Sequence, residues 1–161
     1  MLAPGKPEAP VMFIDARDLA SWILRMAEAK QAGTFNATGP DYVLSMGEHL
    51  DACKRVTKTD ATFTWVDEAF LLEHKVAPYA ELPLWVPEAA IGFNAFDCRK
   101  AWAAGLTFRP LEETIRDTWH WDMPRTEADR NKNARAMIPP PITREREFEL
   151  LKSWKEVVKA S

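Results

Sequence analysis

The chain has 161 residues, with 21 Lys and Arg against 24 Asp and Glu and a formal net charge of −3 at pH 7. Because phosphates are neutralised by clustered Lys and Arg, the absence of a basic block argues against a nucleic-acid partner. No apolar run approaches the roughly 20 residues that cross a bilayer, and the first ten residues lack the hydrophobic segment of a secretory signal. We therefore expect a cytoplasmic globular protein in which Cys53 and Cys98 stay reduced, with no membrane partner.

Glycine is scarce in this sequence, whereas tryptophan is abundant. There are 6 Gly and 7 Trp. Seven Trp indicate a thick aromatic core or a large aromatic interface. Phosphate-binding loops need several closely spaced glycines, but the six here are scattered between Gly5 and Gly105. The sequence therefore carries no usual nucleotide-binding loop.

The first third of the chain predicts alternating short strands and helices. Residues 1–10 are rich in proline and indicate an extended segment, and residues 11–14 predict a strand. Asp15 is a candidate N-cap for a helix over residues 17–30, which we expect Gly33 to end. The apolar residues of that helix recur at helical spacing: Leu19, Trp22, Ile23, Met26 and Ala27.

The next segment repeats this pattern. Residues 34–38, 43–44 and 61–66 predict strands. Ser45 and Glu48 have the spacing of a capping box and predict a helix that reaches about residue 57. Asp67 is the candidate cap of a short helix that ends near residue 73.

Residues 76–92 combine three prolines with several large apolar side chains, which is typical of an ordered loop that lines or covers a pocket. We expect a short strand at residues 93–96, then a helix capped by Asp97 and stopped by Gly105. Pro110 favours the start of a further helix, in which Leu111, Ile115 and Trp119 share a face.

A polar, proline-rich segment separates the end of the chain from the rest. Residues 1–122 form the main unit, residues 123–142 are a polar, proline-rich linker, and residues 143–161 predict a helix, capped by Thr143, that docks on the main unit. Its expected apolar stripe consists of Phe148, Leu151, Trp154, Val157 and Val158.

The histidines give little support for a metal site. His49, His74 and His120 fall on three different predicted elements, and no His-x-x-x-His or Cys-x-x-Cys spacing occurs. Asp117 and His120 would share a helical face, either as an oriented acid–base pair or as a solvated pair. We expect no metal ligands and name no catalytic residue.

Several aromatic residues between positions 65 and 96 could line a ligand pocket, although core packing is the alternative. The pocket candidates are Trp65, Phe70, Trp85, Phe93 and Phe96, with Tyr79 nearby in the sequence. Arg109 could bind an anionic group or remain a solvated arginine.

Five short motifs occur in an order that resembles the C-terminal half of extended short-chain dehydrogenases/reductases, the NAD-dependent epimerase/dehydratase family. The first three are residues 13–20 (FIDARDLA), 34–39 (TFNATG) and 45–48 (SMGE). Residues 104–111 (AGLTFRPL) and 114–118 (TIRDT), followed by Trp121, resemble the closing segments of the family. Residues 143–147 resemble its tail. Asp15, Arg17 and Asp18 lie where the motif strand meets its helix, and a helix cap with a local ion pair is the alternative for them.

The resemblance implies a mixed α/β fold with a small sheet and about six helices, on the substrate-binding side of such an enzyme. The family also uses an N-terminal glycine-rich turn and a Tyr-x-x-x-Lys pair, with NAD or NADP as cofactor. Neither element is present here, because Met46 follows Tyr42 and Pro83 follows Tyr79 at the lysine position. The resemblance therefore implies a substrate-binding portion that binds no cofactor and is not catalytic by itself.

Separation from a nucleotide-binding half has a physical consequence. In the family, residues 17–30 and 34–38 belong to that half, so Leu19, Trp22, Ile23, Met26 and Phe35 would lose part of their cover. Exposed apolar patches favour association. We therefore expect a homo-oligomer or a partner chain that supplies the missing half. The alternatives are a stand-alone module that binds a small molecule or oligomerises without turnover, and a structural protein without a ligand.

Overall fold

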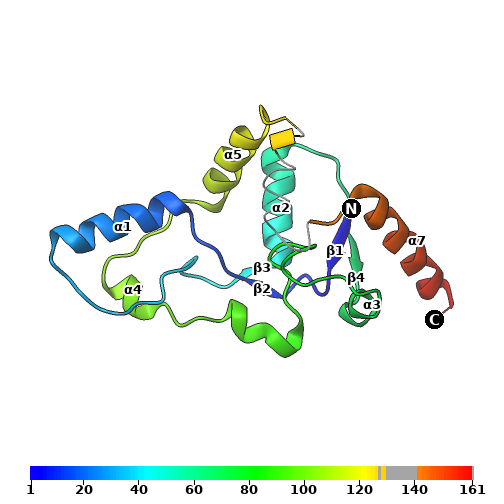
Figure 1. Ribbon diagram of the computed structural model, residues 1–161, viewed down its shortest axis with the longest axis horizontal. Helices are drawn as coiled ribbons and strands as arrows, with labels where there is room; N and C mark the ends of the chain where they lie inside the picture. Colours follow the sequence, from blue (N-terminus) through cyan, green and yellow to red (C-terminus); the bar gives the residue numbers. More distant parts are fainter. Residues whose placement is uncertain (127, 130–140, 161) are drawn as a thin grey trace.

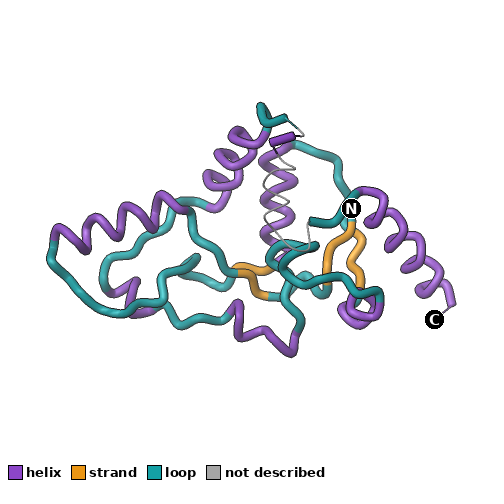
Figure 2. Tube along the Cα trace, in the orientation of Figure 1, coloured by secondary structure: helices purple, strands orange, loops and turns teal. Residues whose placement is uncertain are grey.

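The structure is a computed structural model that describes residues 1–126, 128–129 and 141–160. This part of the chain contains six α-helices, one 3-10 helix and four short strands. Figure 1 shows an elongated molecule, with α1 (Ala16–Glu28) and α4 (Arg99–Ala103) at one end and α7 (Arg144–Ala160) at the other. Long loops join these elements (Figure 2). The prediction of a mixed α/β chain with about six helices and little sheet is confirmed.

The strands form two separate pairs. β1 (Leu2–Pro4) pairs in parallel with β4 (Thr64–Val66), and β2 (Pro10–Val11) pairs antiparallel with β3 (Leu44–Ser45). The expected strands are present near residues 11, 44 and 64; β2 and β4 are shorter than predicted, and β3 is displaced by one residue. β1 was not predicted, because a proline-rich segment gives no strand signal. It is nevertheless fully buried, since it completes the core beside β4.

Two other predicted strands are wrong. Residues 34–38 form no strand. Instead, the Thr34 backbone carbonyl accepts a hydrogen bond from Lys100 Nζ, and the Asn36 side-chain amide donates to the carbonyl of Asp97. No strand of the described chain lies beside this segment to complete a ladder. Residues 93–96 also form no strand, because a 3-10 helix, η1 (Glu88–Asn94), includes the first two of them.

Helix termini mostly follow the local sequence signals. Asp15 caps α1, and Ser45 and Glu48 form the predicted capping box of α2 (Met46–Thr57). Gly105 adopts φ +85° and ends α4, where the Leu106 N–H donates to the Ala101 carbonyl over 3.0 Å.

Three predicted caps are wrong in detail. α1 ends at Glu28, before Gly33. Lys30, rather than a glycine, takes the positive φ, of 53°, that follows the helix. α3 (Glu68–Glu73) follows Asp67, but the Asp67 side chain accepts no capping bond. α4 begins after Cys98, while Asp97 accepts the Arg99 N–H one residue earlier. α5 (Leu111–Asp122) starts directly after Pro110, as expected.

The apolar core consists of two clusters. The larger joins the strands with α2, α3 and the loop around Trp85, and the smaller joins α1 and α4. Trp22 and Met26 are buried in the smaller cluster, so the expectation that both lose cover is wrong. Leu19 and Phe35 also pack against this cluster. Ile23, in contrast, is 52% exposed.

The C-terminal helix packs on the larger cluster through a different stripe from the one predicted. Leu150 is 3% exposed, and Leu151 and Trp154 pack beside it, whereas Phe148 is 70% exposed. Val157 and Val158 are exposed as well. The docked stripe therefore consists of Leu150, Leu151 and Trp154: two predicted residues are retained, and Leu150 is buried in place of Phe148, Val157 and Val158. The predicted linker over residues 123–142 falls largely outside the described residues.

A partly buried ion pair anchors the start of α7. Arg146 donates through Nε to Oε1 of Glu81 over 2.6 Å, and through its other nitrogen to the carbonyl of His74 over 3.1 Å. Glu81 is a buried acid in the loop after α3, and its second oxygen accepts the Ala77 N–H over 2.7 Å. These bonds fix the loop and the helix against one another.

We predict that Leu150→Ala lowers the free energy of unfolding by about 2–5 kcal/mol, because the change leaves a cavity in the larger cluster. The matched control on the same helix is Phe148→Ala, which we expect to change stability by about 0.5 kcal/mol or less, as for an exposed position. Urea unfolding measured by circular dichroism provides both values. Equal losses in the two variants would contradict the observed docking face.

Candidate functional site

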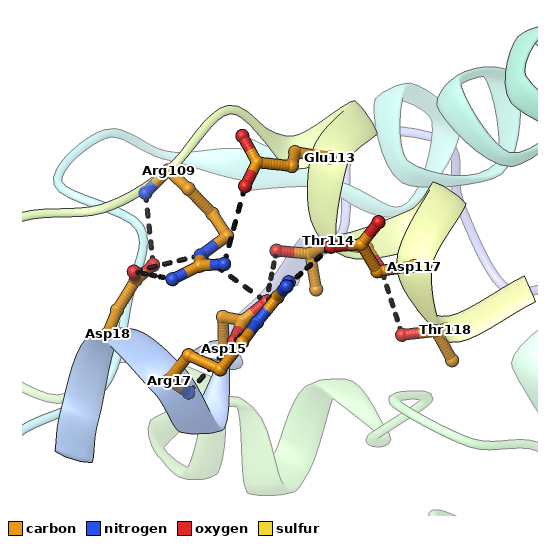
Figure 3. Close-up of polar contacts among 8 residues, drawn as sticks. All are labelled: Asp15, Arg17, Asp18, Arg109, Glu113, Thr114, Asp117 and Thr118. Atoms are coloured by element: carbon orange, nitrogen blue, oxygen red, sulfur yellow. Dashed lines mark hydrogen bonds and ion pairs between the residues drawn. The ribbon is translucent and has the colours of Figure 1, made fainter. Parts of the chain in front are cut away.

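The start of α1 and the segment before α5 meet in a cluster of charged side chains (Figure 3). The structure brings the predicted positions Asp15, Arg17 and Asp18 together with Arg109, which lies 91 residues after Asp18. Glu113 and Asp117, on α5, extend the cluster. Four carboxylates therefore face two guanidinium groups, an excess of two negative charges.

Arg109 is the centre of this cluster. It donates through Nε and Nη2 to Oδ1 of Asp18 over 2.9 Å and 2.7 Å, and its backbone N–H donates to Oδ2 of the same residue over 3.0 Å. Asp15 lies 3.5 Å and Glu113 3.3 Å from its nitrogens. The side chain is only 19% exposed. Arg109 is therefore not a solvated arginine, and its anionic partners come from the chain itself.

Asp15 combines a helix cap with two further interactions. Its carboxylate accepts the Arg17 backbone N–H over 2.9 Å and the Arg17 guanidinium over 2.7 Å. The Thr114 hydroxyl on α5 donates to it over 2.9 Å. Arg17 also pairs with Asp117. Asp117 is thus held by Arg17, so the structure does not show the Asp117–His120 pair that the helical spacing made possible.

The guanidinium groups hold the neighbouring carboxyls in the charged form. Hydrogen bonds from Arg17 are the main reason that the pKa of Asp15 lies well below its ordinary range. Partial burial acts to raise the pKa of Asp18, but hydrogen bonds from Arg109 outweigh it and the net shift is downward. Asp15 and Asp18 therefore stay ionised at neutral pH.

An open cleft of about 980 Å³ lies beside the cluster. It runs between α2 and α5, whose facing sides make the most extensive helix–helix contact in the described chain, and it reaches the start of α1. Its volume is within the range of small-molecule sites. The large apolar side chains that line it are Phe13, Ile14, Leu84, Ile115, Trp119 and Trp121. Asp15, Arg17 and Asp117 place the charged cluster at its edge.

Two side chains of α2 add uncharged polar groups to the cleft. Cys53 Sγ lies 3.8 Å from His49 Nε2, and the Phe13 ring packs edge-on against His49. Burial lowers the pKa of His49 and raises the pKa of Cys53, so both are neutral at pH 7. A neutral thiol is a poor nucleophile. This pair therefore contributes polarity to the cleft wall rather than an activated thiolate.

The five aromatic pocket candidates are not brought together. Phe70 and Trp85 are buried in the larger core cluster, and Trp65 packs against it. Phe93 and Phe96 are exposed and contact one another on the surface. None of the five lines the α2–α5 cleft. For Phe70 and Trp65 the structure favours the alternative of core packing.

Sequence reasoning did not identify the aromatic residues that do line the cleft. Trp119 was placed only on a helix face, and Trp121 only as the closing Trp of the family resemblance. Phe13 was placed only in a strand and in the first resembling motif. The available signal was the stretch from Asp117 to Asp122, in which two Trp alternate with charged or polar residues. Such a helix cannot bury all its apolar residues on one face, because successive residues lie about 100° apart.

Comparison of the chain with protein-family models, with curated proteins and with solved structures finds no match. Two further findings concern the described residues alone. The described residues contain no group of three or more His, Cys, Asp or Glu side chains placed to hold a metal ion. Within the same residues, no helix combines the length and the apolar character required to cross a membrane.

We predict that Asp15→Asn lowers the free energy of unfolding by about 1–3 kcal/mol, because the amide keeps the capping oxygen but loses the charge that faces Arg17 and Arg109. Asp15→Ala should cost about 1 kcal/mol more, since it also removes the cap. Urea unfolding at pH 7 measures both. If the Asn variant is as stable as the wild-type chain, the charge of Asp15 does not contribute.

The same cluster predicts a pH dependence. The folded-state pKa values of Asp15 and Asp18 lie below the unfolded value of about 3.9, so their contribution is complete above about pH 5. It decreases as the pH falls further towards the folded values. We therefore expect the stability difference between the wild-type chain and Asp15→Asn to shrink between pH 5 and pH 2. A difference that stays constant over this interval would contradict the assignment.

Proposed function

We propose that the chain binds a small, mainly apolar molecule in the α2–α5 cleft, and that it is the substrate-binding portion of an NAD(P)-dependent reductase or epimerase. The observation that carries this proposal is the form of the cleft. Its walls are mainly aromatic and aliphatic, and its charged groups, Asp15, Arg17, Asp117 and Asp122, are each already paired within the chain. Such a site binds through apolar burial and orients its ligand through a few polar groups.

The resemblance to extended short-chain dehydrogenases/reductases supports the enzymatic part of the proposal. Asp15, Arg17 and Asp18 come from the first resembling motif, and Arg109, Thr114 and Asp117 come from the last two. All six meet in the cluster at the cleft edge. Segments that resemble one family at separate places in the sequence thus contribute to one site.

The cofactor does not fit this cleft. The sequence carries no glycine-rich turn for a pyrophosphate, and the adjoining cluster has an excess of two negative charges, which repels phosphates. NAD or NADP would therefore be held elsewhere, by another segment or a partner chain. Ile23 and Leu24 are exposed apolar residues on α1, and such a part would pack there.

We expect Thr118→Trp to weaken the binding of N-phenyl-1-naphthylamine, an uncharged fluorescent dye, by at least about tenfold. Thr118 is exposed on α5 and lines the cleft, so an indole there fills the space that the dye needs. Arg116→Trp, on the same helix but outside the cleft, is the matched control and should leave binding unchanged. Fluorescence titration measures the dissociation constants, and equal binding by both variants would contradict the cleft as the binding site.

Isothermal titration calorimetry tests the assignment of the cofactor. We expect NADH and NADPH to show no binding at micromolar concentration to the wild-type chain. Micromolar binding of either would overturn the view that the cofactor is held elsewhere. A chain that binds dye in the cleft and gains no NAD(P)H affinity from any partner would favour the alternative of a stand-alone ligand-binding module.

A further inference from the structure

A second cavity lies away from the α2–α5 cleft and shares no lining residue with it. Its volume is about 610 Å³. Three segments enclose it: the loop between β1 and β2, the start of α3, and the residues from Trp85 to Ile91. In Figure 1, β1 and β2 and the start of α3 lie near the centre and the α7 end of the molecule. The charged cluster of α1 and α5 contributes nothing to this cavity.

The floor of the cavity carries an indole N–H that has no hydrogen-bond partner among the described residues. Trp85 is 2% exposed, yet its indole N–H makes no hydrogen bond to any residue that the structure describes. The nitrogen faces Gly5, because a Cβ added there would lie 3.6 Å from it. Gly5 lines the same cavity. By contrast, the buried indole N–H of Trp22 donates to the carbonyl of Ala104 over 3.0 Å. The Trp85 donor is therefore directed at an acceptor that a ligand can supply.

The rim of the cavity is negatively charged. Glu8, Asp67, Glu68 and Glu88 line it, against the single positive charge of Lys6. Lys6 lies 3.5 Å from Glu88, and Glu68 accepts the Glu88 backbone N–H over 2.8 Å.

Two of these acids have no such interaction. Glu8 and Asp67 are exposed, and the structure gives neither an ion pair nor a side-chain hydrogen bond within the described chain. The negative charge of the rim repels an anionic ligand, whereas the unpaired carboxylates of Glu8 and Asp67 attract a cation. Between rim and floor the surface is apolar, formed by Ala9, Ala69, Val86 and Ile91.

We propose that this cavity binds a small primary ammonium compound that also carries a carbonyl or hydroxyl oxygen. The ammonium group lies against Asp67 and Glu8, the oxygen accepts the Trp85 indole N–H, and the carbon skeleton covers the apolar wall. A free amino acid is excluded by its own carboxylate, because the rim repels it. This ligand class is independent of the apolar molecule proposed for the α2–α5 cleft.

Isothermal titration of the full chain with three related probes tests the class. Leucinamide carries both the ammonium group and the carbonyl, isoamylamine lacks the oxygen, and 4-methylpentanamide lacks the charge. We expect leucinamide to bind at least tenfold more tightly than either relative, and leucine, with its carboxylate, to bind no better than isoamylamine. Equal affinities for all four, or no binding of leucinamide at millimolar concentration, would overturn the proposal.

Variants test the location. Ala69→Trp, at an exposed position of the apolar wall, should abolish leucinamide binding, because the indole fills the cavity. Asp67→Asn should weaken binding at least threefold, whereas the matched control Glu73→Gln, at the far end of α3, should leave it unchanged. Equal effects of Asp67→Asn and Glu73→Gln would overturn the assigned contact with Asp67.

Trp85→Phe separates the role of the indole N–H from that of packing. In a folded variant, leucinamide affinity should fall to the level of isoamylamine, while isoamylamine affinity stays the same. If this variant does not fold, Ala69→Trp and the probe series still decide the proposal. The dye in the α2–α5 cleft serves as an internal control, because leucinamide should not displace it. Displacement would show that the amine binds in the cleft instead and would overturn the second site.

Discussion

The arrangement of the molecule depends on the interaction of Arg109 with Asp18 and Asp15. This contact joins the first turn of α1 to the segment that leads into α5, across 91 residues of sequence. The Thr114 hydroxyl and the Arg17–Asp117 pair repeat the connection one and two turns further along α5. Since α5 also packs along α2, fixing α5 against α1 leaves a cleft with three walls. Paired charges at low exposure are costly to separate, because each leaves a partner that is partly buried and unpaired.

Those features that depend on neighbouring residues could be predicted from the sequence. The Asp15 side chain accepts the N–H of the residue two positions later, and Ser45 and Glu48 exchange hydrogen bonds across three positions. At the end of α4, the N–H groups of Gly105 and Leu106 donate to carbonyls no more than five residues earlier. Residue type at a fixed spacing is sufficient to identify such contacts. The same locality explains why the helices were found with small errors at their ends. It also placed Asp15, Arg17 and Asp18 at one helix terminus before their distant partners were known.

Features that depend on distant residues could not be predicted. A segment with strand propensity becomes a strand only when another strand lies beside it: residues 2–4 have β4 as a neighbour, and residues 34–38 have none among the described residues. An aromatic side chain has the same ambiguity, because a core and a pocket select the same residue types. Phe70 lies in the core, whereas Trp119 lines the cleft, and only the packing of α2 against α5 distinguishes them.

The two cavities differ in how their charges are compensated, and this difference decides what each can bind. At the α2–α5 cleft every charge of the edge cluster has a partner within the chain, so a ligand gains little by adding another charge. Apolar burial then supplies the binding energy, and polar groups supply orientation. At the second cavity Glu8 and Asp67 are uncompensated and the indole donor of Trp85 is unused. A ligand that completes those interactions gains from each one, so charge and hydrogen bonding decide selectivity there. Under the two proposals, the apolar and the cationic molecule would therefore not compete, because the two cavities share no lining residue.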